Sequence, residues 1–166
     1  MNSEIQTIFK DIESAIIRAV ECDVPKEQGI YVCGFWLFYC DHQKISAPCF
    51  AYNNVPTDVE VKWSPAEWVV DIHDGVYDKL NPLYERLSDL MSGKSDEEWE
   101  NLIHYQYEFY CLLCNSLNRN LSPFKKWNTT SDFLIGIFEE REDEEIYENL
   151  VRSSIGEVRV NEIGIL

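Results

Sequence analysis

An unbroken apolar and aromatic run at residues 30–40, IYVCGFWLFYC, constrains the fold of this chain more than any other feature. Its length and its many β-branched and aromatic side chains indicate a buried strand, which we expect at the centre of a sheet. A turn at residues 41–44 predicts a second strand at 45–52, where Pro48 indicates an edge or irregular position. Residues 59–63 alternate apolar and charged side chains and predict a third strand. Together these segments predict an antiparallel meander with one solvated face.

Helical patterns flank these strands. In residues 3–22, apolar side chains recur at helical spacing behind a capping box formed by Ser3 and Gln6. Residues 95–98 form another capping box, which predicts the start of a long helix that lies across the sheet. The apolar face of that helix comprises Trp99, Leu102, Ile103, Tyr110, Leu113, Cys114 and Leu117.

The segment WSPAEW at residues 63–68 carries the most specific local signal. Ser64 suits the N-cap position, Pro65 the first helical position and Glu67 the capping box. Trp63 and Trp68 have the spacing of a hydrophobic staple. The segment therefore predicts a helix that starts here and runs to about residue 90.

The remaining segments complete the predicted fold. Residues 133–138 indicate another buried strand, residues 144–154 a short helix, and residues 158–165 a tail without a clear pattern. A chain of 166 residues fits one domain and can bury a hydrophobic core of its own. We therefore predict a single α+β domain over residues 1–166, with a mainly antiparallel sheet of about four to five strands packed with about four to five helices.

Net charge limits the classes of partner. The chain has 30 Asp and Glu against 14 Lys and Arg, a formal net charge of −16, which repels nucleic acids and anionic membranes and attracts basic protein surfaces. No apolar run is long enough to span a membrane, and residues 1–10 lack the pattern of a secretory signal. We therefore expect a cytoplasmic protein that binds neither nucleic acid nor membrane, with its six cysteines reduced.

Acidic residues cluster directly after the strand predicted at residues 133–138. Such a cluster destabilises the fold by mutual repulsion, and a basic partner would relieve that repulsion. The alternative is a solvated helix start, because helix N-termini favour acidic side chains. We assign partner binding to Glu139, Glu140, Glu142, Asp143, Glu144 and Glu145.

Motifs that fix catalytic chemistry are missing from the sequence. It contains no nucleotide-binding glycine loop, no HExxH and no GxSxG, so we assign no catalytic residue, cofactor or metal. Cys111 and Cys114 form a CxxC pair within a predicted helix and are interpreted as core residues. A zinc site that adds Cys40 with His42, or His104, is the alternative.

A ligand-binding or enzymatic reading is the alternative to partner binding. It would use an aromatic cleft lined by Trp36, Tyr39, Tyr105 and Tyr107. His104, or His73 in the sequence DIHD, would serve as the acid–base group. The structural explanation of the same residues is that the aromatic rings fill the core and that His73 is a surface histidine with acidic neighbours.

A family resemblance rests on residues 63–68, on the leucine-rich helix pair that follows, on residues 133–140 and on Arg152-Ser-Ser. From about residue 31 to about residue 160, the chain resembles a family of uncharacterised bacterial domains that looks related to immunity proteins of polymorphic toxin systems. The resemblance implies a small cytoplasmic protein that binds and blocks a cognate toxin, often a basic nuclease. It implies that acidic residues meet the toxin's phosphate-binding surface, and it implies no catalytic residues.

Overall fold

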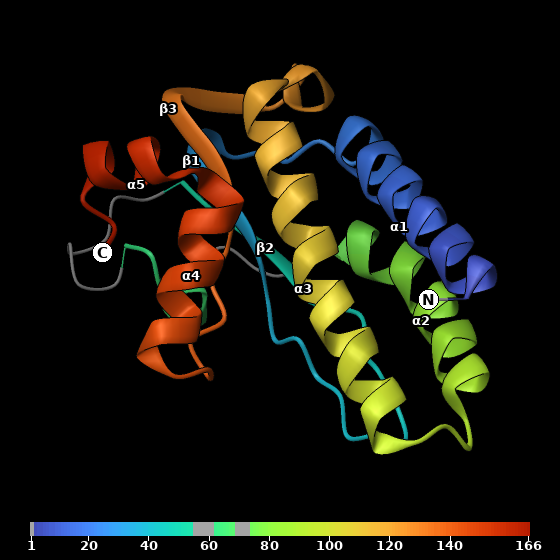
Figure 1. Cartoon of the computed structure of the whole chain (residues 1–166). Coiled ribbons are helices and arrows are strands. Elements are labelled where there is room, and N and C mark those ends of the chain that lie inside the picture. The colour runs from blue at the N-terminus through green and yellow to red at the C-terminus, as the bar shows by residue number, and fades with distance from the viewer. Residues whose placement is uncertain (1, 55–61, 69–73) are drawn as a thin grey trace.

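The computed structural model describes residues 2–54, 62–68 and 74–166, and within them it places one three-stranded sheet among five α-helices (Figure 1). The strands are β1 (Gln28–Trp36), β2 (Cys49–Asn53) and β3 (Asn128–Ile137). The helices are α1 (Ser3–Cys22), α2 (Asp74–Met91), α3 (Asp96–Arg119), α4 (Glu144–Ile155) and α5 (Glu157–Ile163). Two 3₁₀ turns are η1 (Pro65–Glu67) and η2 (Ser122–Phe124). The α+β class is confirmed, whereas the sheet is smaller than predicted.

The sheet is mixed, with the strand order β2-β1-β3. β1 is central, as predicted, and pairs antiparallel with β2 and parallel with β3. The prediction of a mainly antiparallel sheet was wrong for the second pair, because α2 and α3 separate β2 from β3 and form the long crossover that parallel strands require. The predicted strand at residues 59–63 lies mostly outside the described residues, and Lys62 and Trp63 form a turn.

The central strand ends earlier than its apolar run. β1 stops at Trp36 because Leu37 adopts a positive φ of 56°, a left-handed conformation that breaks the ladder. Beyond it, Cys40 forms a single bridge with Ile45, and the second strand begins only at Cys49, directly after Pro48. The residues after β1 therefore form an irregular loop. Phe38 of this loop contacts the candidate site described below.

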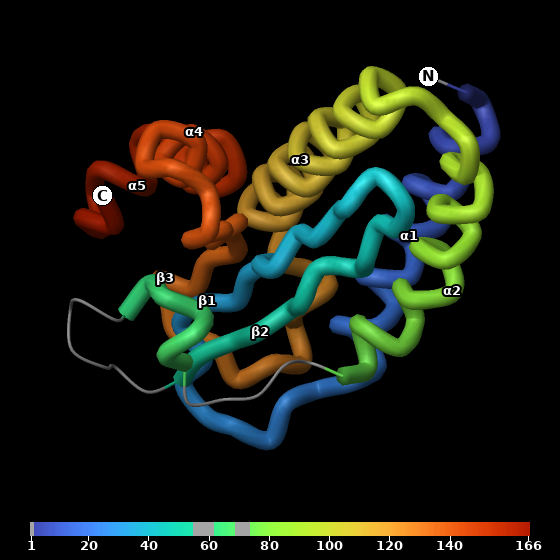
Figure 2. Tube along the Cα trace, turned by 90° about the horizontal axis from the view of Figure 1, so that it is seen from below, coloured from blue at the N-terminus to red at the C-terminus, as the bar shows by residue number. Residues whose placement is uncertain are grey.

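Helices cover both faces of the sheet (Figure 2). On one face, α1, α2 and α3 bury Cys33 and Phe35 of β1 together with Ile135 of β3. On the other face, α4, α5 and the segment at residues 62–68 cover residues such as Val32 and Leu134. Because β1 is buried on both faces from Ile30 onward, its sequence from there to Trp36 is apolar and does not alternate.

Helix starts follow the predicted chemistry in one place and depart from it in another. The capping box of α3 is present, with Glu98 N donating to Ser95 Oγ at 3.3 Å and Ser95 N donating to Glu98 Oε2 at 3.0 Å. At α1 the N-cap is Asn2, not Ser3, and the Asn2 side chain accepts the N–H of Glu4. The Asn2 side chain, one position earlier than predicted, thus satisfies a free backbone donor of the first turn.

The WSPAEW segment does not start the long helix predicted from it. It forms η1, the Ser64 side chain makes no capping bond, and α2 begins at Asp74. Trp63 and Trp68 each pack on Phe138 of the sheet, with ring centroids at 6.5 and 5.6 Å. The two indoles therefore cover the face of the sheet on which α4 and α5 also lie. Packing of these rings determines the conformation of the segment more strongly than its local helix-start pattern.

The tail at residues 158–165, for which the sequence showed no clear pattern, is largely helical, because α5 spans Glu157–Ile163. Within the described ranges, no helix combines the length and the apolar character needed to cross a membrane.

Candidate functional site

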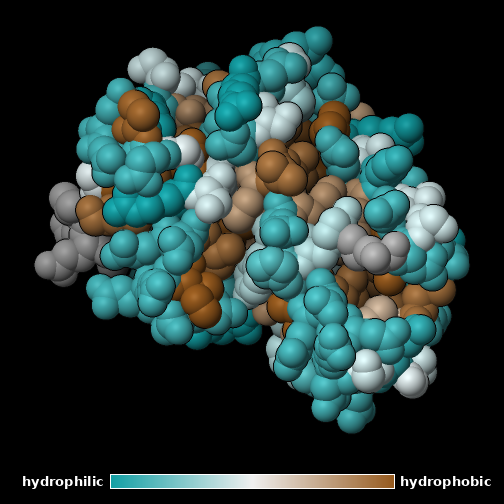
Figure 3. Space-filling model, in the orientation of Figure 1, coloured by the Kyte–Doolittle hydropathy of each residue, from teal (hydrophilic) through white to brown (hydrophobic). Residues whose placement is uncertain are grey.

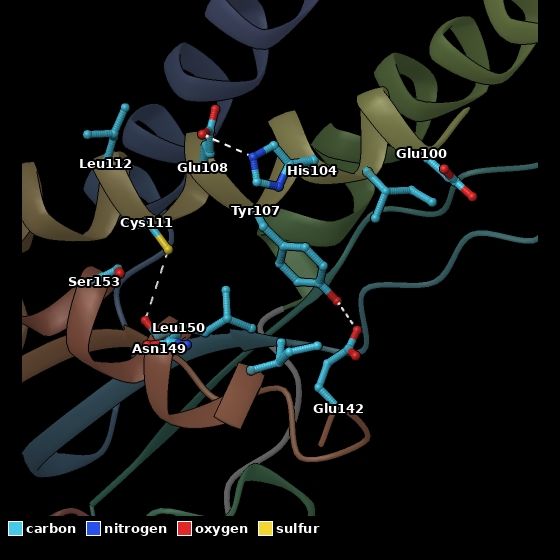
Figure 4. A pocket seen from close by; sticks show the side chains of 12 residues that line it. Glu100, His104, Tyr107, Glu108, Cys111, Leu112, Glu142, Asn149, Leu150 and Ser153 are labelled. Atoms are coloured by element: carbon cyan, nitrogen blue, oxygen red, sulfur yellow. Dashed lines mark hydrogen bonds and ion pairs between the residues drawn. The ribbon is translucent and has the colours of Figure 1, made fainter. Parts of the chain in front are cut away.

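An open groove of about 720 Å³ lies between α3 and α4 (Figure 4). Its floor and walls come almost entirely from these two helices. Figure 3 shows hydrophobic side chains gathered in the hollow between them and bordered by hydrophilic ones. The lining residues are Glu100, Ile103, His104, Tyr107, Glu108, Cys111, Leu112, Glu142, Ile146, Asn149, Leu150 and Ser153.

The two helices run in the same direction, and their pairing sets the shape of the groove. The Cys111 thiol lies 4.0 Å from the carbonyl oxygen of Leu150, and further along Asn118 Nδ2 donates to the carbonyl oxygen of Ser154 at 3.3 Å. α3 directs its main apolar stripe into the core, so the neighbouring stripe faces α4. Cys111 belongs to that second stripe, whereas Leu112 lies with Glu108 at the outer edge of α3, directed away from α4 (Figure 4), and 73% of its surface is exposed. Such exposure of a leucine beside other apolar groups leaves an unpartnered apolar surface.

The rim of the groove is acidic. Glu100 and Glu108 lie along α3, and Glu142 lies in the loop just before α4. Among the described lining residues there is no lysine or arginine. His104 Nε2 lies 3.2 Å from Glu108 Oε1, and both side chains are exposed. The groove therefore combines an apolar floor with a negative edge.

Tyr107 joins the groove to the acidic loop before α4. Its hydroxyl donates to Glu142 Oε1 at 2.8 Å, and its ring packs on Phe38 with centroids 5.1 Å apart. Burial, followed by the bond to Glu142, raises the pKa of the Tyr107 phenol well above its usual range. Tyr107 therefore stays protonated at neutral pH and keeps Glu142 at the rim.

Glu139, one of the six residues assigned to partner binding, is buried and not exposed as a surface patch would require. Only 1% of its surface is exposed. Glu139 Oε2 accepts the N–H of Phe38 at 2.6 Å, and Arg141 donates to both carboxylate oxygens at 2.7 and 2.8 Å. Arg141 also donates to the Phe38 carbonyl oxygen at 3.0 Å. A buried carboxylate requires such partners, and through these bonds Glu139 positions the loop.

The other five predicted residues remain near the surface, and we call them the acidic segment: Glu140, Glu142, Asp143, Glu144 and Glu145. Glu142 is half-buried at the rim of the groove, and the other four are exposed. Asp143 is the N-cap of α4, where its side chain accepts the N–H of Ile146 at 2.9 Å. The alternative of a helix-capping role therefore applies to Asp143, while the side chains of Glu140, Glu144 and Glu145 accept no backbone N–H of the residues that the structure describes.

The aromatic cleft of the alternative hypothesis is not assembled. Tyr107 lines the groove, whereas Tyr105 packs edge-on against Phe9 of α1 at 4.9 Å. Tyr39 is exposed and donates to Asp41, and Trp36 packs with the cluster on the other face of the sheet. The four rings thus lie in separate surroundings. The sequence could not predict this, because it does not show how the helices and loops are oriented relative to one another.

Among the described histidines and cysteines, His104 and Cys111 both line the groove, and the others do not. His73 lies outside the described residues, and His42 Nδ1 lies 3.3 Å from an Asp96 carboxylate oxygen. Across residues 2–54, 62–68 and 74–166, no group of three or more His, Cys, Asp or Glu side chains is arranged to hold a metal. Cys114 is buried in the core, as interpreted, while Cys111 borders the groove. Burial raises the pKa of the Cys111 thiol to about 11.

The sequence reasoning missed the groove itself. Leu112 and Ile146 form part of it, and both are exposed apolar residues in otherwise amphipathic helices. A signal was available, since Leu112 falls outside the main apolar stripe of its helix. Recognising a groove requires knowing that α3 and α4 are neighbours, and that information is not local.

Comparisons of the chain with protein-family models, with curated proteins and with solved structures find no match. The resemblance to immunity-type domains therefore stays a prediction from the sequence. Function has to be inferred from the groove, its charges and its exposed apolar side chains.

Proposed function

We propose that this protein is a binding module that captures a basic surface of another protein at the α3–α4 groove and the acidic segment. The observation that carries the proposal is the convergence of exposed carboxylates on an exposed apolar groove. Apolar contact supplies affinity when it is buried, and surrounding charges select the partner and speed the encounter. Each feature alone is common on protein surfaces, whereas together they suit a basic partner with apolar anchors.

Electrostatics favours a basic partner over an acidic or neutral one. The net charge of −16 attracts cationic proteins at long range. At short range, Glu142 at the rim and Glu144 in the first turn of α4 add negative potential beside the groove. Salt screens such attraction over about 8 Å at physiological ionic strength, so association slows as salt rises.

An immunity-type inhibitor is the form of binding module that we favour. Such an inhibitor needs no catalytic residues of its own. It would act by covering the cationic surface of a toxin. The sequence resemblance and the acidic surface both point to this role, and a nuclease is the cationic class that it would suit best because nucleases bind phosphates. In this proposal the protein acts in the cytoplasm without a cofactor.

A small apolar ligand is the second candidate, favoured by the volume of the groove. About 720 Å³ lies within the range of ligand-binding pockets. Tyr107 would offer its ring to such a ligand, but its hydroxyl already donates to Glu142. The basic-partner proposal accounts in addition for the acidic rim.

The test compares two variants that carry the same net charge. The first neutralises exposed residues of the acidic segment and leaves the structural bonds of Glu142 and Asp143 intact. Its substitutions are Glu140→Gln, Glu144→Gln and Glu145→Gln. The control neutralises three exposed carboxylates of α1 and α2, away from the groove, through Asp11→Asn, Glu13→Gln and Glu85→Gln.

Tagged wild type and both variants are incubated with native lysate at low salt, washed at rising salt, and the retained proteins are identified by mass spectrometry. We expect wild type and the control variant to retain the same basic protein and the acidic-segment variant to lose it. Expression of that partner alone should arrest cell growth, and co-expression of this protein should restore it. Retention of no protein, or equal retention by all three proteins, contradicts the proposal, and a retained small molecule would favour the second candidate.

A further inference from the structure

We infer that the occupant of the α3–α4 groove is an amphipathic helix of the partner, with apolar side chains on one face and lysine or arginine along both flanks. This inference rests on the proposed function and specifies the chemistry of the partner. Helix-in-groove recognition needs a long apolar trough with room for residues spaced at i, i+3 and i+7. The groove meets that requirement in length, in lining and in charge.

The length of the groove fits a short helix. Its lining on α3 extends from Glu100 to Leu112. At 1.5 Å per residue this interval is about 18 Å, which is about three turns of a docked helix. Three turns present apolar anchors at three successive positions of one face.

The apolar lining offers contacts for those anchors. Leu112 on α3 has 73% of its surface exposed, and Ile146 on α4 has 40%. Leu150 is buried at the floor between them, and the Tyr107 ring lies further along α3. Ile146 lines the groove from α4 and Leu112 from the outer edge of α3, so a helix lying in the groove would contact Ile146 and reach Leu112 at that edge. An extended strand would instead need free backbone N–H and C=O groups in the groove to pair with. The two helices that line the groove use theirs in their own hydrogen bonds.

The charges at the rim determine the flanks of the docked helix. Glu108 lies on the α3 side, and Glu142 lies at the α4 end. A helix with basic residues on both flanks places one cation toward each rim. A second copy of this chain suits the groove poorly, because two molecules of net charge −16 repel each other.

The direct test uses designed peptides as probes. One fluorescent peptide of about 15 residues carries leucine at i, i+3 and i+7 with lysine on both flanks, and a second has the same composition in scrambled order. Both are titrated against wild type and against Leu112→Gln/Ile146→Gln, which removes apolar surface without changing charge. The matched control is Val158→Gln in α5, because Val158 is also 73% exposed and does not line this groove. Circular dichroism and thermal unfolding verify that every variant is folded.

We expect wild type and Val158→Gln to bind the amphipathic peptide with equal affinity. The scrambled peptide, and the double variant with the amphipathic peptide, should each bind at least tenfold more weakly. Equal binding of both peptides would reduce the effect to charge alone and overturn the inference. Unchanged binding by Leu112→Gln/Ile146→Gln would place the helix elsewhere, and a wild-type dimer that this variant dissociates would identify a second copy as the occupant.

Failure of this inference is distinguishable from failure of the proposed function. If the basic protein retained from lysate is lost by the acidic-segment variant but kept by Leu112→Gln/Ile146→Gln, partner capture stands and groove docking is wrong. If neither variant affects retention, the proposed contact surface itself is wrong.

Discussion

The carboxylate of Glu139 accepts the backbone N–H of Phe38 at 2.6 Å, although the two residues lie 101 positions apart in the chain. The bond ties the loop after β1 to the loop after β3. Arg141 strengthens the connection by donating to both the Glu139 carboxylate and the Phe38 carbonyl oxygen. Since the Phe38 ring packs on Tyr107, this buried cluster supports the end of the groove where the acidic segment begins.

Replacing Glu139 with alanine should lower the free energy of unfolding by about 2 to 3 kcal/mol. The change leaves the Phe38 N–H buried without its acceptor. Arg141 is 47% exposed and can return to water, which keeps the loss below that of a fully buried ion pair. Urea denaturation measures the difference. Glu140→Ala is the neighbouring control and should stay within about 0.5 kcal/mol of wild type; an equal loss at both positions would contradict the role of Glu139.

Tyr84 and Tyr110 predict a double-mutant signature. Their hydroxyl oxygens lie 3.0 Å apart in the core, and both side chains are buried. Tyr84→Phe leaves the buried Tyr110 hydroxyl without this hydrogen-bond partner and should lower the free energy of unfolding by about 1 to 2 kcal/mol. The double variant Tyr84→Phe/Tyr110→Phe removes both polar groups and should be more stable than either single variant. Additive losses in denaturation would show that the two hydroxyls do not depend on each other.

Paired glycines of the sheet should respond unequally to alanine. A Cβ at Gly34 would lie 2.5 Å from Phe138 Cδ2 and 2.9 Å from the Gly136 carbonyl oxygen. A Cβ at Gly136 would meet only side-chain atoms, Ile155 Cδ1 and Cγ1 and Phe138 Cζ, each at the longer distance of 3.0 Å. Gly34→Ala should therefore cost about 2 to 3 kcal/mol and Gly136→Ala less than about 1 kcal/mol. Thermal unfolding of the two variants gives the comparison, and the reverse order would contradict the packing described for β1 and β3.

Alkaline pH should destabilise the fold. Burial raises the pKa of the phenols and thiols inside the protein, including Cys111 to about 11 and Tyr147 to about 12. The unfolded chain releases these protons near 9.0 for cysteine and 10.0 for tyrosine. Above about pH 9 the unfolded state therefore holds fewer protons than the folded state, so stability is complete below that pH and declines as pH rises.

Urea midpoints at about pH 7.5 and about pH 10.5 measure this effect. The midpoint should be lower at the higher pH, with Tyr84, Tyr107 and Tyr110 contributing through their raised pKa values. Tyrosine absorbance recorded in parallel should show these phenols ionising only as the protein unfolds. An unchanged midpoint would contradict the burial of these groups.

Local chemistry was predictable where neighbouring residues determine it. The Ser95–Glu98 capping box needs only four consecutive residues, and it is present at the start of α3. The apolar run of β1 indicated a central strand, which the structure confirms. Its end was not predictable, because the positive φ of Leu37 depends on the loop that Glu139 and Arg141 hold in place.

Non-local relationships account for the errors. Parallel pairing of β1 with β3 depends on the path of two long helices between the strands. Glu139 is one of several consecutive acidic letters, yet its place at the end of β3 directs it inward, while Glu140 is exposed. The groove forms only where α3 packs against α4. The sequence does not show that these helices are neighbours, so it did not identify Leu112 as a candidate functional residue.

The association rate constant of the captured basic partner, measured by stopped-flow mixing at about 20 and about 200 mM salt, tests the proposed binding surface most directly. The proteins compared are wild type, the variant Glu140→Gln/Glu144→Gln/Glu145→Gln, and the control of equal net charge in α1 and α2. At low salt, the acidic-segment variant should associate about fivefold or more slowly than the control variant, and high salt should reduce the difference. Equal rates for the two variants would contradict the proposal, because the effect would then depend on net charge and not on the carboxylates beside the groove.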